Sequence, residues 1–518
     1  MFHFTPVGNS RFRGQNSSDS ETTVFMPMGF LPGFTAILAP FLAASLAFWG
    51  NLKLLVFFNS LAFFLFALFF AGRFLSGKSF YLPGGYRFFF AAVFLSAVSA
   101  AVSPVRGLIG LEYSRFLASA LLFLVFLNVE RTYLEKAVKV VYFIFSLMFL
   151  VALHQFFFGG IREVNSTFNN ANSMAFFCLL GLGFALENKN YYMAALVLAM
   201  LFMTASAGGL LALLAVASWY FLKTRFSGAL KKNKTAVLLV AALGVFVVSQ
   251  VGHSSVSERL EWWKGALGMF ADRPVTGWGS GAFSYVYPAF HKPGAGLSSI
   301  YAHNYYLEFL AENGVLAFAL WTYFLYYLVS SSSGFYKYAL AAVLLHGFVD
   351  FSMAQQSNLW FFFFLAGISA RNRVEVAPAA GRRLLPVFLG LVLAAGLAKW
   401  AFLCYGSLDE ERALKRSFAL LAEKREEETL ALLSEKIEKY PLSFDLNAVS
   451  SDILLNRALE KNDRKLFFRA AGNLEYLLII NPYYIPAYER LEKIYSSAGE
   501  TEILKELAAR KKAHIKWN

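Results

Sequence analysis

Apolar residues run along this chain in blocks that are separated by short polar segments. A block of about 20 apolar residues is long enough to cross a bilayer as an α-helix. Such blocks recur from Met28 to Tyr405, so the pattern predicts an all-α fold built as a polytopic transmembrane helical bundle. We expect about thirteen spans, at 28–49, 54–71, 87–104, 112–128, 138–158, 172–186, 191–207, 209–222, 235–251, 308–329, 337–353, 357–370 and 384–404.

Both ends of the chain differ from this pattern. Residues 1–27 are polar and lack the short apolar core of a cleaved signal, so we expect a cytoplasmic tail there. In residues 407–518, apolar positions recur at helical spacing among charged residues, with breaks at Tyr440-Pro441 and Asn481-Pro482. This predicts an extramembrane α-helical domain like a short tetratricopeptide (TPR) array, which either docks a protein partner or serves only solubility. Residues 28–406 are then the transmembrane domain.

The composition supports a membrane protein, with 58% hydrophobic and only 15% charged residues. The net charge of +14 lies in residues 1–406, because residues 407–518 hold 19 basic and 19 acidic residues. The excess Lys and Arg cluster in alternate loops, as the positive-inside rule predicts, which argues against a nucleic-acid partner. This alternation places the basic loops in the cytoplasm, and it places the long loop 252–307 and the C-terminal domain outside. Neither Cys178 nor Cys404 indicates a disulfide framework or a metal site.

One long polar stretch, 272–314, interrupts the apolar pattern, and costly polar clusters beside a membrane usually serve function. His303 is the candidate general base, because imidazole titrates near neutral pH. Arg259 and Arg273 are the candidate phosphate ligands, although an arginine here could instead anchor lipid headgroups. Lys264 lies on the same amphipathic helix as Arg259, and the glycines at 277, 279 and 281 permit close backbone approach to a ligand.

Further polar residues are expected to surround this centre. Glu308 and Glu312 share a helical face with Asn304, so they either orient the histidine or an acceptor hydroxyl, or only begin a solvated helix. The predicted topology brings other polar side chains to the outer ends of the spans: Arg115, Arg162, Asn169, Asn172, His346 and Asp350. The outer loops contain no cluster of metal-ligand type, which favours a reaction that needs neither a metal nor another cofactor.

Several segments resemble the O-antigen ligase and polymerase superfamily of bacterial membrane glycosyltransferases. They are STFNNANSMA at 166–175, ERLEWWKGALGMFADRPVTGWGSGAF at 258–283, AHNYYLEFLAENGVLAF at 302–318 and HGFVDF at 346–351. The resemblance covers roughly residues 30–370. It implies a GT-C-like helical fold in the bacterial cytoplasmic (inner) membrane, with an active site on its periplasmic face.

The resemblance also implies a chemistry. A glycan would leave an undecaprenyl-pyrophosphate donor and join an acceptor hydroxyl with inversion; His303 would act as the base, and Arg259 and Arg273 would hold the pyrophosphate. Ala207 stands where the family often has arginine, so Arg115 or Arg162 is a possible substitute. The acceptor could be a lipid, as in ligases, a protein, as in O-oligosaccharyltransferases, or another repeat unit, as in polymerases. A glycan or lipid transporter is the alternative outside the enzymes.

Overall fold

The computed structural model describes residues 52–75, 78–225, 253–291, 299–376 and 384–517. The predicted cytoplasmic tail 1–27 and the predicted spans 28–49 and 235–251 lie outside the described residues. Within the described part the fold is all-α apart from one two-stranded sheet, as the apolar pattern predicted.

The first half of the described chain forms α2 to α8, and the second half forms α10 to α20. The first set comprises α2 Leu52–Leu75, α3 Tyr86–Ala101, α4 Gly110–Phe126, α5 Arg131–Phe157, α6 Ala171–Glu187, α7 Tyr191–Met203 and α8 Ala207–Arg225. The second set begins with α10 His253–Asp272, α11 Phe283–Val286, η1 Tyr287–Phe290, α12 Tyr305–Ser331, α13 Gly334–His346, η2 Ser352–Ala354 and α14 Gln356–Ser369. It ends with α15 Leu384–Ala422, α16 Glu426–Lys439, α17 Phe444–Lys461, α18 Arg464–Ile480, α19 Ile485–Ala498 and α20 Thr501–His514.

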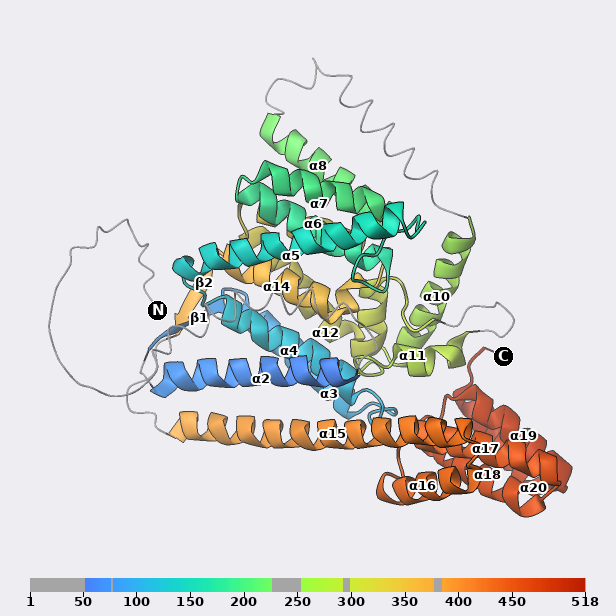
Figure 1. Cartoon of the computed structure of the whole chain (residues 1–518). Helices are drawn as coiled ribbons and strands as arrows, with labels where there is room; N and C mark the ends of the chain where they lie inside the picture. The colour runs from blue at the N-terminus through green and yellow to red at the C-terminus, as the bar shows by residue number, and fades with distance from the viewer. Residues whose placement is uncertain (1–51, 76–77, 226–252, 292–298, 377–383, 518) are drawn as a thin grey trace.

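Helices α2 to α8 and α12 to α15 form a bundle whose two ends differ (Figure 1). One end carries the small antiparallel sheet, in which β1 (Phe80–Pro83) pairs with β2 (Arg373–Val376). The other end carries α10, α11 and the C-terminal helices α16 to α20 (Figure 1). The short loops that begin α4, α6 and α8 also lie at this second end, so polar residues that are far apart in sequence meet there.

Three helices within the described residues are long and apolar enough to cross a membrane: Leu52–Arg73, Tyr133–Phe157 and Tyr305–Ser331. Shorter apolar helices accompany them at 86–101, 171–187, 191–203 and 207–221. Large apolar side chains such as Phe64, Phe94 and Phe143 are exposed on the bundle surface, where a soluble protein would need polar residues. The chain is therefore a membrane protein.

Two predicted spans have different ends in the structure. The span expected at 337–353 stops at His346, because Gly347 begins a turn that leads to the 3-10 helix η2. The span expected at 384–404 continues to Ala422, so α15 passes through the compositional boundary at Ser407 without a break. Helix α15 packs along α2, where the Trp400 indole Nε1 donates to Ser60 Oγ at 2.8 Å. One continuous helix thus joins the bundle to the C-terminal helices.

Helix α12 contains a sharp kink at Gly314, whose φ of 75° is outside the helical range. The segment 274–281 packs into this kink, where Val315 N donates to Pro274 O at 2.9 Å and Gly279 N donates to Glu312 O at 2.7 Å. The polar stretch singled out from the sequence is therefore built around a broken transmembrane helix.

Candidate active site

Asp350 lies at the centre of a buried hydrogen-bond network. Its side chain is only 1% exposed. The backbone N–H of Ser352 donates to Asp350 Oδ1 at 2.8 Å, and the Ser352 hydroxyl donates to the same oxygen. Asn172 Nδ2 donates to the other oxygen, Oδ2, at 2.9 Å. A carboxylate with three donors is fixed in place, which makes it suitable for orienting or stabilising a charged partner.

Asn172 connects this carboxylate to two further loops. It lies in the first turn of α6, where the side chain of Asn170 caps the helix by accepting from Asn172 N at 2.7 Å. Asn172 Oδ1 also accepts a hydrogen bond from Ser206 Oγ at 2.7 Å, one residue before α8 begins. The starts of α6 and α8 and the turn after α13 are thus joined at one point.

His303 lies against this network. Its ring stacks on Trp262 with centroids 4.4 Å apart, and the ring of Phe351 meets it edge-on at 4.8 Å. The distance from His303 Nδ1 to Asp350 Oδ2 is 4.0 Å, just beyond hydrogen-bond range, and Nδ1 has no hydrogen-bond partner within the described residues. A small shift would close this gap, as catalytic hydrogen bonds often tighten only when substrate binds.

The backbone holds His303 in an uncommon conformation, with φ at 50°. Such strain costs about 1–3 kcal/mol and is often found at functional sites. The next residue, Asn304, caps α12 by accepting from Tyr306 N and Leu307 N, both at 3.1 Å. Asn304 therefore fixes the start of α12, directly after His303.

Burial lowers the pKa of His303, Asp350 opposes this shift, and the positive charge of Arg259 adds to it. A lowered pKa favours the neutral imidazole, which is the state that a general base needs. Arg259 lies one helical turn before Trp262 on α10, so both reach the same side of the helix. Among the described residues no carboxylate pairs with Arg259, which leaves its guanidinium available to an anion.

His346 is a second imidazole in the same region. Its side chain is buried, and neither ring nitrogen has a hydrogen-bond partner within the described part of the chain. It lies beside Gly208, where a Cβ atom would be 3.2 Å from Nε2 of His346. Asp350 and Arg259 both act on it electrostatically, as they do on His303. The four residues therefore form one group of charged and titratable side chains.

Glu308 and Glu312 are buried and bind backbone N–H groups. Glu308 Oε2 accepts from Ala302 N at 2.7 Å, and Glu312 Oε1 accepts from Phe283 N at 2.9 Å. Glu308 holds the residue before His303, while Glu312 holds the start of α11. Both carboxylates thus act on the site through the backbone that they bind.

The three glycines lie against this chain's own backbone and side chains. Their φ angles are all positive, at 65° for Gly277, 98° for Gly279 and 87° for Gly281. A Cβ atom at Gly277 would lie 2.3 Å from Glu312 O, and one at Gly281 would lie 2.3 Å from the Cβ of Glu112. The glycine spacing is therefore required for packing against α12 and α4.

The predicted phosphate ligands separate into two groups. Arg259 lies with His303, whereas the Arg273 guanidinium lies 4.5 Å from the ring centroid of Trp278, next to the C-terminal domain. Lys264 is 71% exposed and pairs with Glu261 at 2.6 Å. The structure does not bring Lys264 and Arg273 to His303 by any contact within the described residues.

Arg115, Arg162 and Asn169 also differ in position. Arg115 is largely buried, pairs with Glu112 at 2.6 Å and acts electrostatically on Tyr301. The ring of Tyr301 stacks on Phe351 at 4.4 Å, so Arg115 connects to the edge of the His303 site through two aromatic rings. Arg162 and Asn169 are exposed in the loop before α6.

Sequence reasoning missed Ser206, Ser352 and the two aromatic walls of the site, Trp262 and Phe351. The spacing of Arg259 and Trp262 on one helix could have indicated a shared face. Nothing in the local pattern around Ser206 indicates that it meets Asn172, because that contact joins residues 34 positions apart. Ser352 lies only two residues after Asp350, and an aspartate often accepts from the backbone two residues further on, so this contact could have been found.

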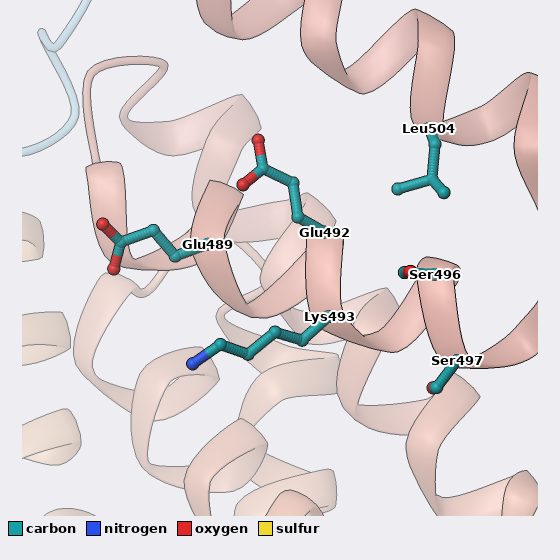
Figure 2. A pocket seen from close by; sticks show the side chains of 6 residues that line it. All are labelled: Glu489, Glu492, Lys493, Ser496, Ser497 and Leu504. Carbon is teal, nitrogen blue, oxygen red and sulfur yellow. The ribbon is translucent and has the colours of Figure 1, made fainter.

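Two other features bear on where the site lies. Within the described residues, no three His, Cys, Asp or Glu side chains converge as metal ligands would. A cavity of about 700 Å³ lies between α19 and α20, lined by Glu489, Glu492, Lys493, Ser496, Ser497 and Leu504 (Figure 2). Its walls combine both signs of charge without a nucleophile and base pair, and Figure 1 places both helices within the C-terminal domain. The group around His303 is therefore the stronger candidate.

Comparison with known proteins adds one finding. Residues 192–322 match the family model described as O-antigen ligase. The match includes α10, the glycine-containing segment, His303 and the kink of α12. No curated protein matches the sequence.

Proposed function

We propose that this chain, whose residues 192–322 match the O-antigen ligase family model, is a membrane glycosyltransferase. In this proposal it transfers a glycan from undecaprenyl pyrophosphate to an acceptor hydroxyl on the outer face of the cytoplasmic membrane. The observation that carries this proposal is the position of His303, whose ring stacks on Trp262 and whose Nδ1 lies 4.0 Å from Asp350 Oδ2. Beside it lies Arg259, which no carboxylate neutralises among the residues that the structure describes. That arrangement supplies a base and a cation at one place, which are the two groups that such a transfer needs.

In the proposed reaction, His303 removes the proton from the acceptor hydroxyl as the oxygen attacks the anomeric carbon of the donor. The new bond joins the acceptor oxygen to that carbon, and the bond from the carbon to the pyrophosphate oxygen breaks. Attack opposite the leaving group inverts the anomeric centre. The imidazolium that forms is stabilised by the Asp350 carboxylate, which already accepts three hydrogen bonds and keeps its position.

Arg259 is the residue that we assign to the leaving pyrophosphate. Its guanidinium acts on His303, and a planar guanidinium can bind two phosphate oxygens at once. Arg115 is the candidate for a second contact in place of the arginine that Ala207 replaces, because it connects to the site through Tyr301 and Phe351. Arg162 is exposed and Lys264 is paired with Glu261, so neither has comparable support.

The pH dependence of transfer should respond in opposite directions to two substitutions. Because a general base must be neutral, activity falls below the pKa of His303. Asp350 raises that pKa and Arg259 lowers it. Asp350→Asn should therefore move the acidic limb of the kcat/KM profile to lower pH, and Arg259→Gln should move it to higher pH. Profiles that move in the same direction, or not at all, would exclude His303 as the titrating base.

The proposed topology has about thirteen spans, with the active site and the TPR-like domain outside. Its support is the asymmetry of the bundle. Arg73 donates to Ser79 O, just before β1, and Arg371 lies two residues before β2. His303 stacks on Trp262, which belongs to the same buried cluster as Tyr483 of the C-terminal helices. In a variant without Cys178 and Cys404, cysteines at Lys264 and Leu459 should react with an impermeant reagent in intact cells. A cysteine at Tyr192 should react only after permeabilisation. The reverse pattern would invert the topology.

Loss of the protein should cause a lipid-linked glycan to accumulate, and its length identifies the reaction. Accumulation of full-length chains supports en bloc transfer to a lipid or protein acceptor, whereas accumulation of single repeat units would indicate a polymerase. Analysis of the acceptor that lacks glycan in the same cells separates lipid from protein. If no lipid-linked glycan accumulates, the proposed donor is wrong.

A further inference from the structure

We propose that Tyr483 of the C-terminal domain is a positioning residue for Arg273, so that donor binding depends on the docked C-terminal helices. The inference rests on the proposed function for the identity of the ligand, but the docking contacts stand independently of it. The C-terminal domain then acts as part of the enzyme's site, in addition to any partner that it binds.

The end of the C-terminal domain docks on the segment that follows α10. Asn481 Nδ2 donates to Tyr285 O at 3.2 Å, and Lys516 N donates to Ala289 O at 2.8 Å. The Trp517 indole Nε1 donates to Pro288 O at 3.2 Å. Lys516 Nζ also lies 3.6 Å from Asp272, the residue before Arg273. These polar contacts fix both the position and the orientation of the domain on the loop.

Apolar packing covers the same junction. Tyr483 and Ile515 of the C-terminal domain are buried in a cluster with Met269, Trp278 and Tyr287. The cluster continues to Trp262, on which the ring of His303 stacks. A displacement of the C-terminal helices would therefore loosen a core that extends to the proposed base.

Arg273 lies where these two parts of the protein meet. Its guanidinium lies 4.5 Å from the ring centroid of Trp278, and the Trp278 ring meets Tyr483 edge-on at 5.1 Å. Trp278 itself is fixed by donation from its Nε1 to Met269 O at 2.8 Å. The charge of Arg273 also acts on the Tyr483 phenol, opposing the effect of burial, which raises the pKa of that group. The loop supplies one ring beside Arg273 and the C-terminal domain supplies the second.

This arrangement explains why Arg273 is separate from Arg259 in the structure. The guanidinium keeps its charge when it lies on an aromatic ring, and it remains partly exposed. It can therefore bind a second part of an anionic donor while its position is set by Trp278 and Tyr483. Since no contact within the described residues joins Arg273 to His303, we expect the loss of Arg273 to change donor binding more than the chemical step.

The test compares Tyr483→Ala, Tyr483→Phe and the matched control Tyr476→Ala in full-length protein in lipid nanodiscs, with undecaprenyl-pyrophosphate glycan as donor. Tyr476 lies on α18 of the same domain with a half-exposed side chain. Tyr483→Ala should raise the donor KM about tenfold with little change in kcat, because it removes a ring that orients Arg273. Tyr483→Phe should restore most of the affinity, and Tyr476→Ala should behave as the unchanged protein.

A double-mutant cycle distinguishes positioning from general destabilisation. In an Arg273→Ala background, Tyr483→Ala should cause no further rise in the donor KM, since its effect acts through the missing guanidinium. An equal rise in both backgrounds, or an unchanged KM in Tyr483→Ala, would overturn the proposal.

Hydrogen exchange supplies a measurement that does not depend on activity. Amides of residues 272–290 should exchange faster in Tyr483→Ala and remain as protected in Tyr476→Ala as in the unchanged protein. If exchange changes in this way while the unchanged protein transfers no glycan, the proposed function fails and the docking role of Tyr483 stands. If transfer is normal and exchange is unaffected in Tyr483→Ala, the docking role of Tyr483 fails.

Discussion

His303→Ala is expected to lower the rate of glycan transfer by roughly 10²–10⁴-fold, the usual contribution of a positioned general base. The ring of His303 is 20% exposed, so it is open to an acceptor from one side while Trp262 and Phe351 pack against it. Donor affinity should change little, because the proposed phosphate contacts belong to arginines. Single-turnover transfer and equilibrium donor binding, both on purified protein, separate the two effects.

His291→Ala is the matched control for this experiment. His291 lies in the same long loop, 252–307, but its ring stacks on Tyr287 rather than on Trp262. Its substitution should leave the rate within about twofold, as expected for a residue outside the reaction. Equal losses in both variants would point to disturbance of the loop, and near-normal transfer in His303→Ala would leave Arg259 and positioning as the remaining source of catalysis.

Gly277→Ala is expected to destabilise the folded protein by about 3 kcal/mol or more, near the upper range for a single substitution. Two causes act together at this position. The backbone has φ at 65°, which residues with a Cβ atom rarely adopt, and the new Cβ would lie 2.3 Å from Glu312 O. Because the new Cβ would collide with backbone atoms, the kink in α12 would have to move, and this movement lowers the stability of the folded protein further. Thermal unfolding followed by size-exclusion chromatography measures the loss.

Gly472→Ala controls for the general effect of adding a methyl group. Gly472 lies inside α18 with helical backbone geometry, and a Cβ atom added there would meet no neighbouring atom within 4 Å. Alanine should therefore be neutral there or stabilise the helix by up to about 1 kcal/mol. Similar unfolding temperatures for Gly277→Ala and the unchanged protein would show that the contact between the loop and α12 is not needed for stability.

The sequence pattern predicted the helices well because apolar periodicity is a local property. Helix α6 begins at Ala171 and α14 at Gln356, each within a residue of the predicted starts at 172 and 357. The ends were less predictable where a turn or a second domain intervened, as at His346 and in α15. Apolar periodicity does not indicate that Gly347 begins a turn or that a span continues into a soluble helix.

The candidate site was predictable in its residues but only partly in its contacts. His303, Asp350 and Asn172 were all named from the sequence, and the structure brings them together. Asn172 and Asp350 are 178 residues apart in the sequence. The three glycines were expected to permit close backbone approach to a ligand, but the sequence does not identify which atoms of the protein itself lie against them. Arg273 was placed with Arg259 because both lie in one loop, yet its neighbour Tyr483 lies 210 residues further along the chain.

The most direct test of the proposed transfer uses the purified full-length protein in lipid nanodiscs with a radiolabelled undecaprenyl-pyrophosphate glycan and membrane extract as the source of acceptor. We expect one undecaprenyl pyrophosphate to be released for each glycan joined to acceptor, with an inverted anomeric linkage and the same rate in the presence of a divalent-metal chelator. Glycan that remains on its lipid while the protein moves it across a bilayer, with no pyrophosphate released, would contradict the proposed transfer and identify a transporter.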